Sequence, residues 1–269
     1  MLVIAHVALK LFEHPLSPYA RKVKIVLYEK GVPFDRVFVT PLTLRETDSV
    51  FPDFAATNPR LEVPCIVDGD FRAFDSTIIV DYIDEKWPDP PMLSTNLEER
   101  ARARMVEDLC DTAIEAVNWG MMEIRFFKRA EGAQAEQMVA RGGAQLERLW
   151  DHLDPQLEGR PWFSGEKFGR ADASLIVHVV AAELFGFPPQ DRHARLRDWS
   201  VRCQMVHGVK RDQADLAAFM GSDGLRAMRK GTIRRQYRDH RLEWILKTGG
   251  FDIVQRGLDK DTIQFSVFP

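Results

Sequence analysis

The sequence predicts an α/β unit followed by an all-helical unit, with the two kinds of structure separated along the chain. Residues 8–87 alternate strand-like apolar runs with segments of helical periodicity. The proline-dense stretch 87–91 follows, and no convincing strand appears beyond it until the tail. These observations divide the chain into an N-terminal unit, a linker, a helical unit and a C-terminal extension, with the ranges 1–87, 88–95, 96–230 and 231–269.

The first helix of the α/β unit has clear start and stop signals. A strand ends at Phe12, and Ser17 and Pro18 then occupy an N-cap and a first helical position, where these residue types are favoured. Gly31 is a natural stop for this helix. The next strand is predicted over 34–39, and the polar segment 40–58 has room for at most one short helix.

A hairpin and a second capped helix complete this unit. Pro64 precedes a strand-like run, which suits the start of a strand because proline has no N–H to donate. Asp68-Gly69-Asp70 predicts the turn of an antiparallel hairpin, and a strand over 71–74 returns from it. Asp75-Ser76 then begins a helix that we expect to end near Trp87.

Beyond the linker, apolar residues recur at helical spacing and predict an all-α unit. Its first segment reads as a single long helix, and its last helix is shorter than the others. The predicted helices are Glu98–Arg129, Gln134–Leu157, Asp172–Phe185, His193–Val206 and Gln213–Met220.

The composition excludes several classes of function. The formal charge of −3 at pH 7 provides no field that would attract nucleic acid or an anionic membrane, so we expect neither partner. No apolar run is long enough to span a bilayer, and the apolar start lacks the basic region of a signal peptide. Three widely spaced cysteines without a CxxC motif argue against a disulfide framework and against zinc. We therefore expect a cytoplasmic protein with a small-molecule or protein partner and no metal.

Three residue pairs carry a resemblance to a known family. They are Ser17-Pro18 at the first strand-to-helix corner, Val63-Pro64 before the hairpin, and Asp75-Ser76 at the start of a later helix. With the linker and the helical unit behind them, they make residues 8–225 similar to the glutathione transferase superfamily, in a bacterial-type form with serine at the N-terminal active-site position. The resemblance implies a thioredoxin-like domain before the helical one, a cis Val63–Pro64 bond, glutathione as co-substrate and a homodimer.

Two positions depart from the family's pattern. Leu61 stands where the family commonly has glycine, two residues before Val63. Gly169 stands where the family has Ser or Thr, at the first position of a capping box completed by Asp172. Asp172 can still accept hydrogen bonds from the backbone, but the reciprocal side-chain bond is missing. Neither departure changes the predicted fold.

Ser17 is the candidate catalytic residue. A glutathione thiol that resembles free cysteine has a pKa of about 8.5, so only a few per cent of it is thiolate at neutral pH. A hydroxyl that donates to the sulfur, at a helix N-terminus whose dipole favours negative charge, would lower that pKa. Ser17 would otherwise only cap its helix, and Arg21 would either add positive charge or lie in solvent. We interpret Cys65 as a buried residue and His14 as a turn residue.

The resemblance also implies a binding site for the rest of the tripeptide. Asp75 and Ser76 would hold the γ-glutamyl group, or would only cap their helix. The backbone at Val63 and Pro64 would pair with the cysteinyl part like an added strand. A cation must hold the glycyl carboxylate, and the candidates are Arg45, Arg60 and Lys10.

A pocket for a second substrate is expected between the two domains, where the first long helix faces Ser17. The residues to inspect there are Glu107, Asp111, Ala113, Glu115, Trp119 and Met122. A serine at position 17 cannot form a mixed disulfide, so it favours attack of the thiolate on an electrophilic, largely apolar small molecule. Conjugation, ether cleavage, dehalogenation and isomerisation all remain open. The rival hypothesis is a non-catalytic glutathione transferase-like binding or scaffold module.

The extension 231–269 is too rich in large apolar residues for a solvated tail, so these residues need a surface to bury them. Arginines 234, 235, 238 and 241 interleave with apolar residues and predict one more amphipathic helix. Gly249-Gly250 and an extended end over 263–268 follow it. We expect the extension to pack on the helical domain or on the partner subunit, either as a lid over the pocket or as a brace away from it.

Overall fold

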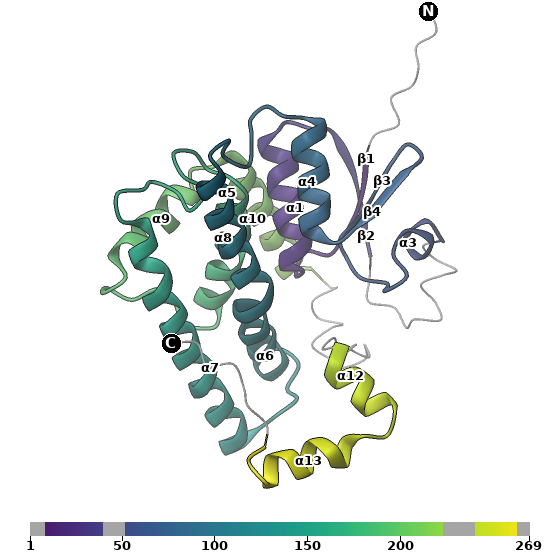
Figure 1. Ribbon diagram of the computed structural model, residues 1–269, viewed down its shortest axis with the longest axis vertical. Coiled ribbons are helices and arrows are strands. Elements are labelled where there is room, and N and C mark those ends of the chain that lie inside the picture. The colour runs from purple at the N-terminus through teal and green to yellow at the C-terminus, as the bar shows by residue number, and fades with distance from the viewer. Residues whose placement is uncertain (1–8, 40–51, 223–239, 263–269) are drawn as a thin grey trace, which may run out of the picture.

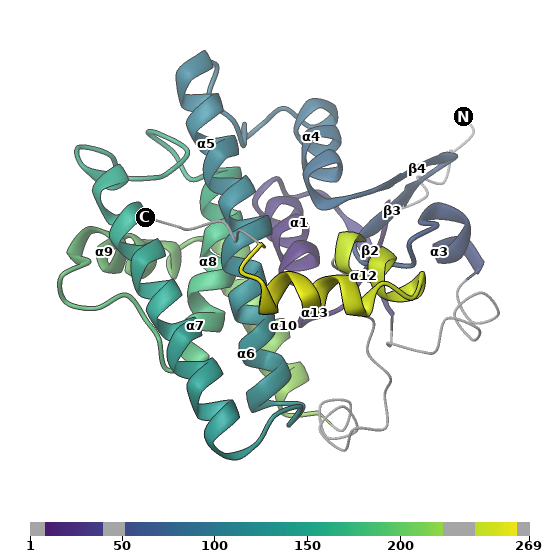
Figure 2. The ribbon, with the colours of Figure 1, turned by 60° about the horizontal axis from the view of Figure 1, so that its bottom comes forward.

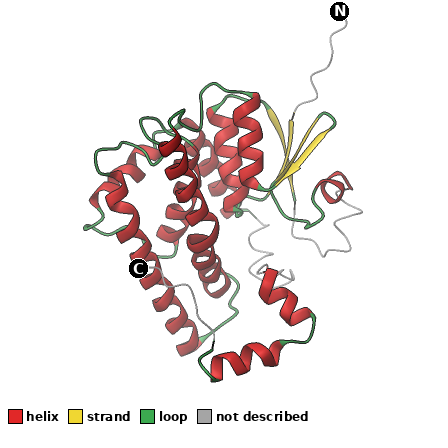
Figure 3. Cartoon of the chain, in the orientation of Figure 1, coloured by secondary structure: helices red, strands yellow, loops and turns green. Residues whose placement is uncertain are grey.

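The computed structural model describes residues 9–39, 52–222 and 240–262 (Figure 1). A four-stranded sheet with helices on both faces comes first, and a group of helices follows it (Figure 3). The prediction of a thioredoxin-like N-terminal domain followed by an all-helical domain is therefore confirmed. One continuous apolar core runs through both parts, from Leu11 in the sheet to Trp199 in the helices.

The sheet has the strand order β2-β1-β3-β4. Its strands are β1 (Leu9–Glu13), β2 (Phe34–Phe38), β3 (Cys65–Asp68) and β4 (Phe71–Phe74). β1 runs parallel to β2 and antiparallel to β3, and β3 and β4 form the predicted hairpin, whose turn has Gly69 at φ +62°. Helices α1 (Pro18–Glu29) and α4 (Ser76–Lys86) cover one face, and the short helix α3 (Pro52–Thr57) covers the other (Figure 1).

Helix α1 is the element that joins the two domains, because it packs against α4 on one side and against α8 and α10 of the helical domain on the other. Ser17 is its N-cap and Pro18 its first residue, as predicted. All residues from Ala20 to Leu27 are buried, so the polar side chains of this stretch are buried together with the apolar ones. Such burial requires partners for every charge.

The helical domain contains the elements that the periodicity predicts, with shifted bounds. They are α5 (Leu97–Leu109), a π-helical segment (Cys110–Ile114), α6 (Glu115–Arg125), α7 (Gly132–Leu153), α8 (Arg170–Leu184), α9 (Ala194–Cys203) and α10 (His207–Met220). The predicted helix over 98–129 thus continues through the π-helical segment but ends at Arg125.

Helix α10 begins at His207 rather than at the predicted Gln213. The weak helix former Gly208 concealed this start, because glycine lowers helix propensity. In the structure glycine is needed there, since a Cβ on Gly208 would lie 2.5 Å from the carbonyl oxygen of Ile25 in α1. The carboxylate of Glu29 also accepts a hydrogen bond from the Gly208 amide, which replaces a conventional N-cap.

Packing also explains the glycine at the start of α8. A Cβ on Gly169 would lie 2.5 Å from the carbonyl oxygen of Met92, so no Ser or Thr fits. Asp172 accepts hydrogen bonds from the amides of Gly169 (3.1 Å) and Phe163 (2.8 Å) and from the indole of Trp199 (2.8 Å). The prediction that Asp172 still accepts from the backbone is confirmed.

The described part of the extension forms two helices, α12 (His240–Lys247) and α13 (Phe251–Asp259). They lie apart from the domains in the view of Figure 1 and pass in front of them in the view of Figure 2. α13 follows directly after Gly249-Gly250 and is absent from the sequence prediction. Several large side chains of these helices are exposed, namely Trp244, Leu246, Phe251, Ile253 and Leu258. The predicted start of the amphipathic helix at 234–238 and the predicted extended end at 263–268 lie outside the described residues. Across the described ranges, no helix combines the length and the apolarity needed to cross a membrane.

Candidate active site at one edge of the sheet

Strand register brings the three residue pairs that carry the family resemblance to the same edge of the sheet. Phe12 at the end of β1 pairs with Cys65 at the start of β3, and Cys65 pairs with Phe74 at the end of β4. The chain segments that flank this row therefore leave or enter the sheet side by side. These segments carry Ser17-Pro18, Val63-Pro64 and Asp75-Ser76.

Ser17 lies half-buried at the N-terminus of α1, with extended backbone angles of φ −79° and ψ 113°. Its Oγ accepts a hydrogen bond from the Ala20 amide at 3.3 Å, and its own amide donates to the His14 carbonyl at 2.8 Å. Capping uses only an acceptor site of the hydroxyl, because a serine hydroxyl has one proton and two lone pairs. The hydroxyl can therefore cap α1 and still donate to a ligand atom.

Val63 and Pro64 form the entry to β3, and the bond between them is cis, as the resemblance implies. Val63 is half-buried, whereas Pro64 and Cys65 are buried. Burial raises the pKa of the Cys65 thiol to about 12, so this cysteine is not a thiolate at neutral pH. The prediction that Cys65 is a buried residue and not a nucleophile agrees with this environment.

Asp75 is the N-cap of α4. Its Oδ1 accepts hydrogen bonds from the amides of Thr77 (3.0 Å) and Ile78 (3.3 Å), and Ser76 is the buried first residue of the helix. The capping role considered for this pair is thus present. Asp75 also has a φ of +77°, a conformation that is costly for a residue with a Cβ and that gathers at ligand sites. The second carboxylate oxygen of Asp75 takes no part in these capping bonds.

The cation for a glycyl carboxylate is not fixed by the described residues. Arg45 lies outside them. Arg60 lies over the Phe74 ring at 5.1 Å from its centroid and pairs with Glu62 at 3.9 Å. Lys10 pairs with Asp53 at 3.8 Å. Arg60 is therefore beside the residue that ends β4, directly before Asp75.

Tyr19 brings an acidic environment close to Ser17. Its hydroxyl donates to the Asp111 carbonyl at 3.0 Å. Burial raises the pKa of Tyr19 above its usual value, and the carboxylates of Glu115, Asp111, Glu62 and Asp75 raise it further, so the phenol stays protonated. These carboxylates make the surroundings of the phenol acidic.

The π-helical segment connects this region to a buried charge cluster. Lys22 Nζ lies 2.8 Å from Glu107 and 2.7 Å from Asp111. Burial alone would raise the pKa of Glu107, but Lys22 and Arg170 lower it below its usual value. Burial raises the pKa of Asp111, although Lys22 acts against the rise. Glu107 is thus an internal counter-ion, whereas Asp111 lies at the boundary between the cluster and the site.

Arg21 does not lie in solvent, because its side chain is buried against α10. Its guanidinium lies 2.8 Å from Asp212 of α10, and both side chains are at most 5% exposed. The helical pattern of α1 alone could not reveal this partner, which lies 191 residues away. Arg21 therefore holds the two domains together.

An aromatic cluster beside Ser17 escaped the sequence analysis. Phe219 of α10 is buried, and Leu16, Phe126, Phe127 and Met220 pack against it. The Phe219 ring also lies 5.2 Å from the His14 ring and 5.8 Å from the Phe38 ring. The adjacent phenylalanines 126–127, directly after a long helix, were the available signal. His14 is thus more than a turn residue, because it packs into this cluster.

Of the six residues expected to line a pocket for a second substrate, Glu107 and Asp111 belong to the charge cluster around Lys22. The other four follow them along the first long helix. Trp119 and Met122 are half-buried, as are Ala113 and Glu115, and they lie on the π-helical segment or α6. Ala113 packs against the main core.

Among the described residues, no group of three or more His, Cys, Asp or Glu side chains is arranged to hold a metal ion.

The chain thus combines a thioredoxin-like sheet, a cis-proline at one edge of it and a helical domain behind it. The sequence profile described as "Glutathione S-transferase, N-terminal domain" matches residues 11–91. The stringent starvation protein A homologue of Pasteurella multocida is 30% identical over 217 residues, covering 81% of this chain and 91% of that protein. The chain belongs to the glutathione S-transferase superfamily.

Two further relatives widen the comparison. Glutathione S-transferase 1 of Dianthus caryophyllus is 25% identical over 215 residues, which are 74% of this chain and 92% of that protein. The solved structure of FzlA from C. crescentus superposes with a TM-score of 0.67 and 23% identity, and covers 77% of this chain and 92% of that chain. At this identity, the FzlA structure supports the fold alone.

Proposed function

We propose that this protein is a glutathione-dependent transferase that activates the glutathione thiolate at Ser17 for attack on an electrophilic, largely apolar small molecule. The observation that carries the proposal is the shared sheet edge, where the N-terminus of α1, the cis Val63–Pro64 bond and the N-terminus of α4 meet. The aromatic cluster around Phe219 supports the choice of an apolar second substrate.

In this proposal each pair has one task. The Ser17 hydroxyl donates to the sulfur while the α1 dipole favours its negative charge, and lowering the thiol pKa by two units requires about 2.7 kcal/mol. The backbone of Val63 pairs with the cysteinyl part, next to Pro64. The free oxygen of Asp75 takes the γ-glutamyl ammonium, and Ser76 with its helix amides takes the neighbouring carboxylate. Arg45 remains our candidate for the glycyl carboxylate.

The reaction follows from these positions. The thiolate attacks an electrophilic carbon, a carbon–sulfur bond forms, and the leaving group departs with the bonding electrons. Conjugation, thiol-dependent ether cleavage and dehalogenation share this step, and isomerisation would instead expel the thiolate again. A homodimer and a cytoplasmic location belong to the same proposal.

A non-catalytic glutathione transferase-like scaffold is the second candidate. It is favoured by the Pasteurella multocida relative, because the name stringent starvation protein A homologue includes no transferase activity. Incubation of glutathione with a chlorodinitroarene, an epoxide, a β-aryl ether and an unsaturated ketone discriminates between the two. Consumption of any of them above the uncatalysed rate supports the transferase, whereas binding of glutathione without turnover of the whole panel supports the scaffold.

Asp75→Asn tests the binding site directly. Asparagine is an equally good N-cap and tolerates positive φ, so the fold should persist. Loss of the charge-assisted bond to the ammonium should weaken glutathione binding about tenfold, with a smaller effect on the chemistry of the bound thiol. Calorimetry measures the affinity, and Asp70→Asn in the exposed hairpin turn is the matched control. Equal affinity in the wild type and Asp75→Asn would remove Asp75 from the site.

A further inference from the structure

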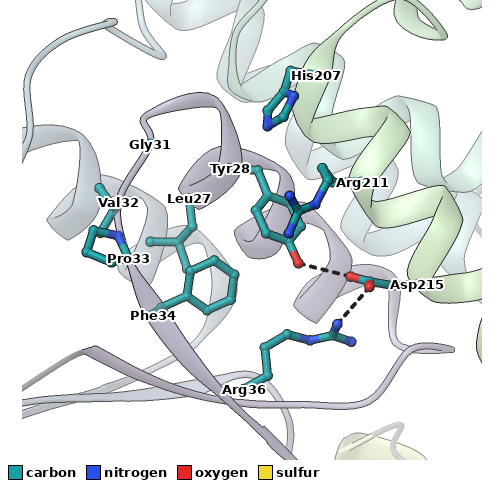
Figure 4. Close-up of a pocket in the computed structure, with 10 residues that line it drawn as sticks. All are labelled: Leu27, Tyr28, Gly31, Val32, Pro33, Phe34, Arg36, His207, Arg211 and Asp215. Atoms are coloured by element: carbon teal, nitrogen blue, oxygen red, sulfur yellow. Dashed lines mark hydrogen bonds and ion pairs between the residues drawn. The ribbon is translucent and has the colours of Figure 1, made fainter.

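A second cleft lies at the opposite end of α1 from Ser17 (Figure 4). The last turn of α1, the connection to β2 and the first turns of α10 form its walls, and its volume is about 380 Å³. This volume falls within the range of small-molecule sites. Tyr28 lies ten positions along the helix from Pro18, a rise of about 15 Å, so this cleft is at the far end of α1 from the Ser17 corner. Its lining shares no residue with the proposed glutathione site.

One side of the cleft is apolar and aromatic. Leu27, Val32, Pro33 and Phe34 form this side, and the Phe34 ring lies 5.2 Å from the Tyr28 ring (Figure 4). Pro33 is exposed and Phe34 is half-buried, so this surface is accessible. Flat aromatic ligands gain most from such a wall, because rings pack favourably in offset or tilted arrangements.

The opposite side carries two arginines, of which Arg36 has carboxylate partners and Arg211 has an aromatic one. Arg36 is engaged by Asp215 at 2.7 Å and by Glu13 at 2.6 Å, and Tyr28 donates its hydroxyl to Asp215 at 3.0 Å. Arg211 is exposed, lies 5.0 Å from the centroid of the Tyr28 ring, and has no carboxylate partner among the described residues. A guanidinium held on an aromatic face keeps its N–H edges available for a ligand.

The paired charges behind the cleft and on its wall balance each other. The pairs are formed by three cations and three carboxylates, namely Arg21, Lys24 and Arg36 with Glu13, Asp212 and Asp215. Glu29 is matched by the N-terminus of α10, where it accepts from the Gly208 amide. Arg211 therefore adds a positive charge that this network does not neutralise, and His207 lies beside it on the cleft wall (Figure 4).

We propose that this cleft binds a small aromatic monoanion, such as an arene carboxylate. The ring lies against Phe34 and Tyr28, and the acid group accepts hydrogen bonds from Arg211, with His207 at the edge. The apolar wall selects a ring, the single excess charge selects a monoanion, and the planar guanidinium matches the geometry of a carboxylate.

Calorimetry with 2-naphthoate, and with the neutral isostere 2-naphthamide, tests this proposal on the full-length chain. Binding of one naphthoate per chain is expected, with the amide at least about tenfold weaker because it lacks the charge. Arg211→Gln should weaken naphthoate about tenfold. The matched control is Lys210→Gln, an exposed cation on the same helix that does not line the cleft, and it should keep the wild-type affinity.

His207→Gln provides a second variant on the same wall, with an expected loss of about threefold if the ring contributes one neutral hydrogen bond. Excess S-hexylglutathione should leave naphthoate binding unchanged, because the Ser17 corner lies at the other end of α1. Three results would overturn the proposal: no naphthoate binding, equal affinity in Arg211→Gln and wild type, or displacement by S-hexylglutathione. None of these results bears on the role of Ser17, so the two proposals fail separately.

Discussion

Asp212→Asn tests whether the charge cluster between α1 and α10 contributes to stability through its charges and not only through packing. Asp212 is 1% exposed in α10 and faces two cations of α1. Its carboxylate lies 2.8 Å from the Arg21 guanidinium and 3.2 Å from Lys24 Nζ, and the side chain of Lys24 is fully buried. Asparagine keeps the shape of the side chain and removes only its charge, so the change tests electrostatics.

The expected loss follows from what remains around the two cations. Lys24 keeps Asp215 at 3.3 Å and Glu13 at 3.9 Å, but Arg21 loses its only carboxylate partner among the described residues. Removing one member of a buried pair costs 3–5 kcal/mol, and we expect about 3 kcal/mol because Lys24 retains partners. For a chain of this size the melting temperature should fall by about 6–12 °C.

Urea unfolding of the wild type and the variant measures this loss of free energy. Asp198→Asn is the matched control, because Asp198 is an exposed carboxylate on α9 and its change should stay within about 0.5 kcal/mol. The double variant Arg21→Met, Asp212→Leu should recover part of the loss, since apolar groups can replace a buried ion pair while Lys24 keeps Asp215 and Glu13. If Asp212→Asn unfolds at the wild-type urea concentration, the cluster does not hold the domains together.

Two further predictions concern single residues. His178 is fully buried in α8, and burial, aided by Lys22 and Arg21, lowers its pKa to about 3. Only the unfolded state then binds this proton between pH 6.5 and 3, so the free energy of unfolding falls as the pH falls through this range. Between pH 7.5 and pH 5 the wild type should lose about 2 kcal/mol more of this free energy than His178→Gln. Equal losses in the two proteins would contradict the buried neutral imidazole. Leu61 has a φ of +53°, so Leu61→Gly should change the free energy of unfolding by less than about 1 kcal/mol while Leu61→Val loses about 1–2 kcal/mol; the reverse order in urea melts would contradict the strain.

The sheet edge could be predicted from the sequence because its signals are local. An N-cap followed by proline at 17–18, a proline at the start of a strand, and a capped helix at 75–76 each depend on a few neighbouring residues. The family resemblance added the cis bond at Val63–Pro64. Leu61, which stands where the resemblance implies a glycine, has a positive φ, a conformation that glycine adopts without steric cost.

The rest of the site depends on partners that are distant in the sequence. Phe38, Phe126 and Phe219 come from three separate parts of the chain and meet only in the fold. Arginine is mostly exposed in proteins, so the sequence alone gives no reason to expect Arg21 to be buried. Its burial depends on Asp212, across the domain boundary. A helical pattern identifies an apolar face, but it carries no information about which distant charge neutralises a buried one.

The thiol pKa of bound glutathione, measured in wild type and Ser17→Ala by titration of the thiolate absorbance, tests the role of Ser17. We expect a pKa about two units below that of the free thiol in the wild type and a value near the free thiol in the variant. Turnover of the reacting electrophile should fall about 10²-fold, because the donor to the sulfur is lost while the helix dipole remains. The same thiol pKa in both proteins, together with unchanged turnover, would contradict the account and leave Ser17 as a helix cap.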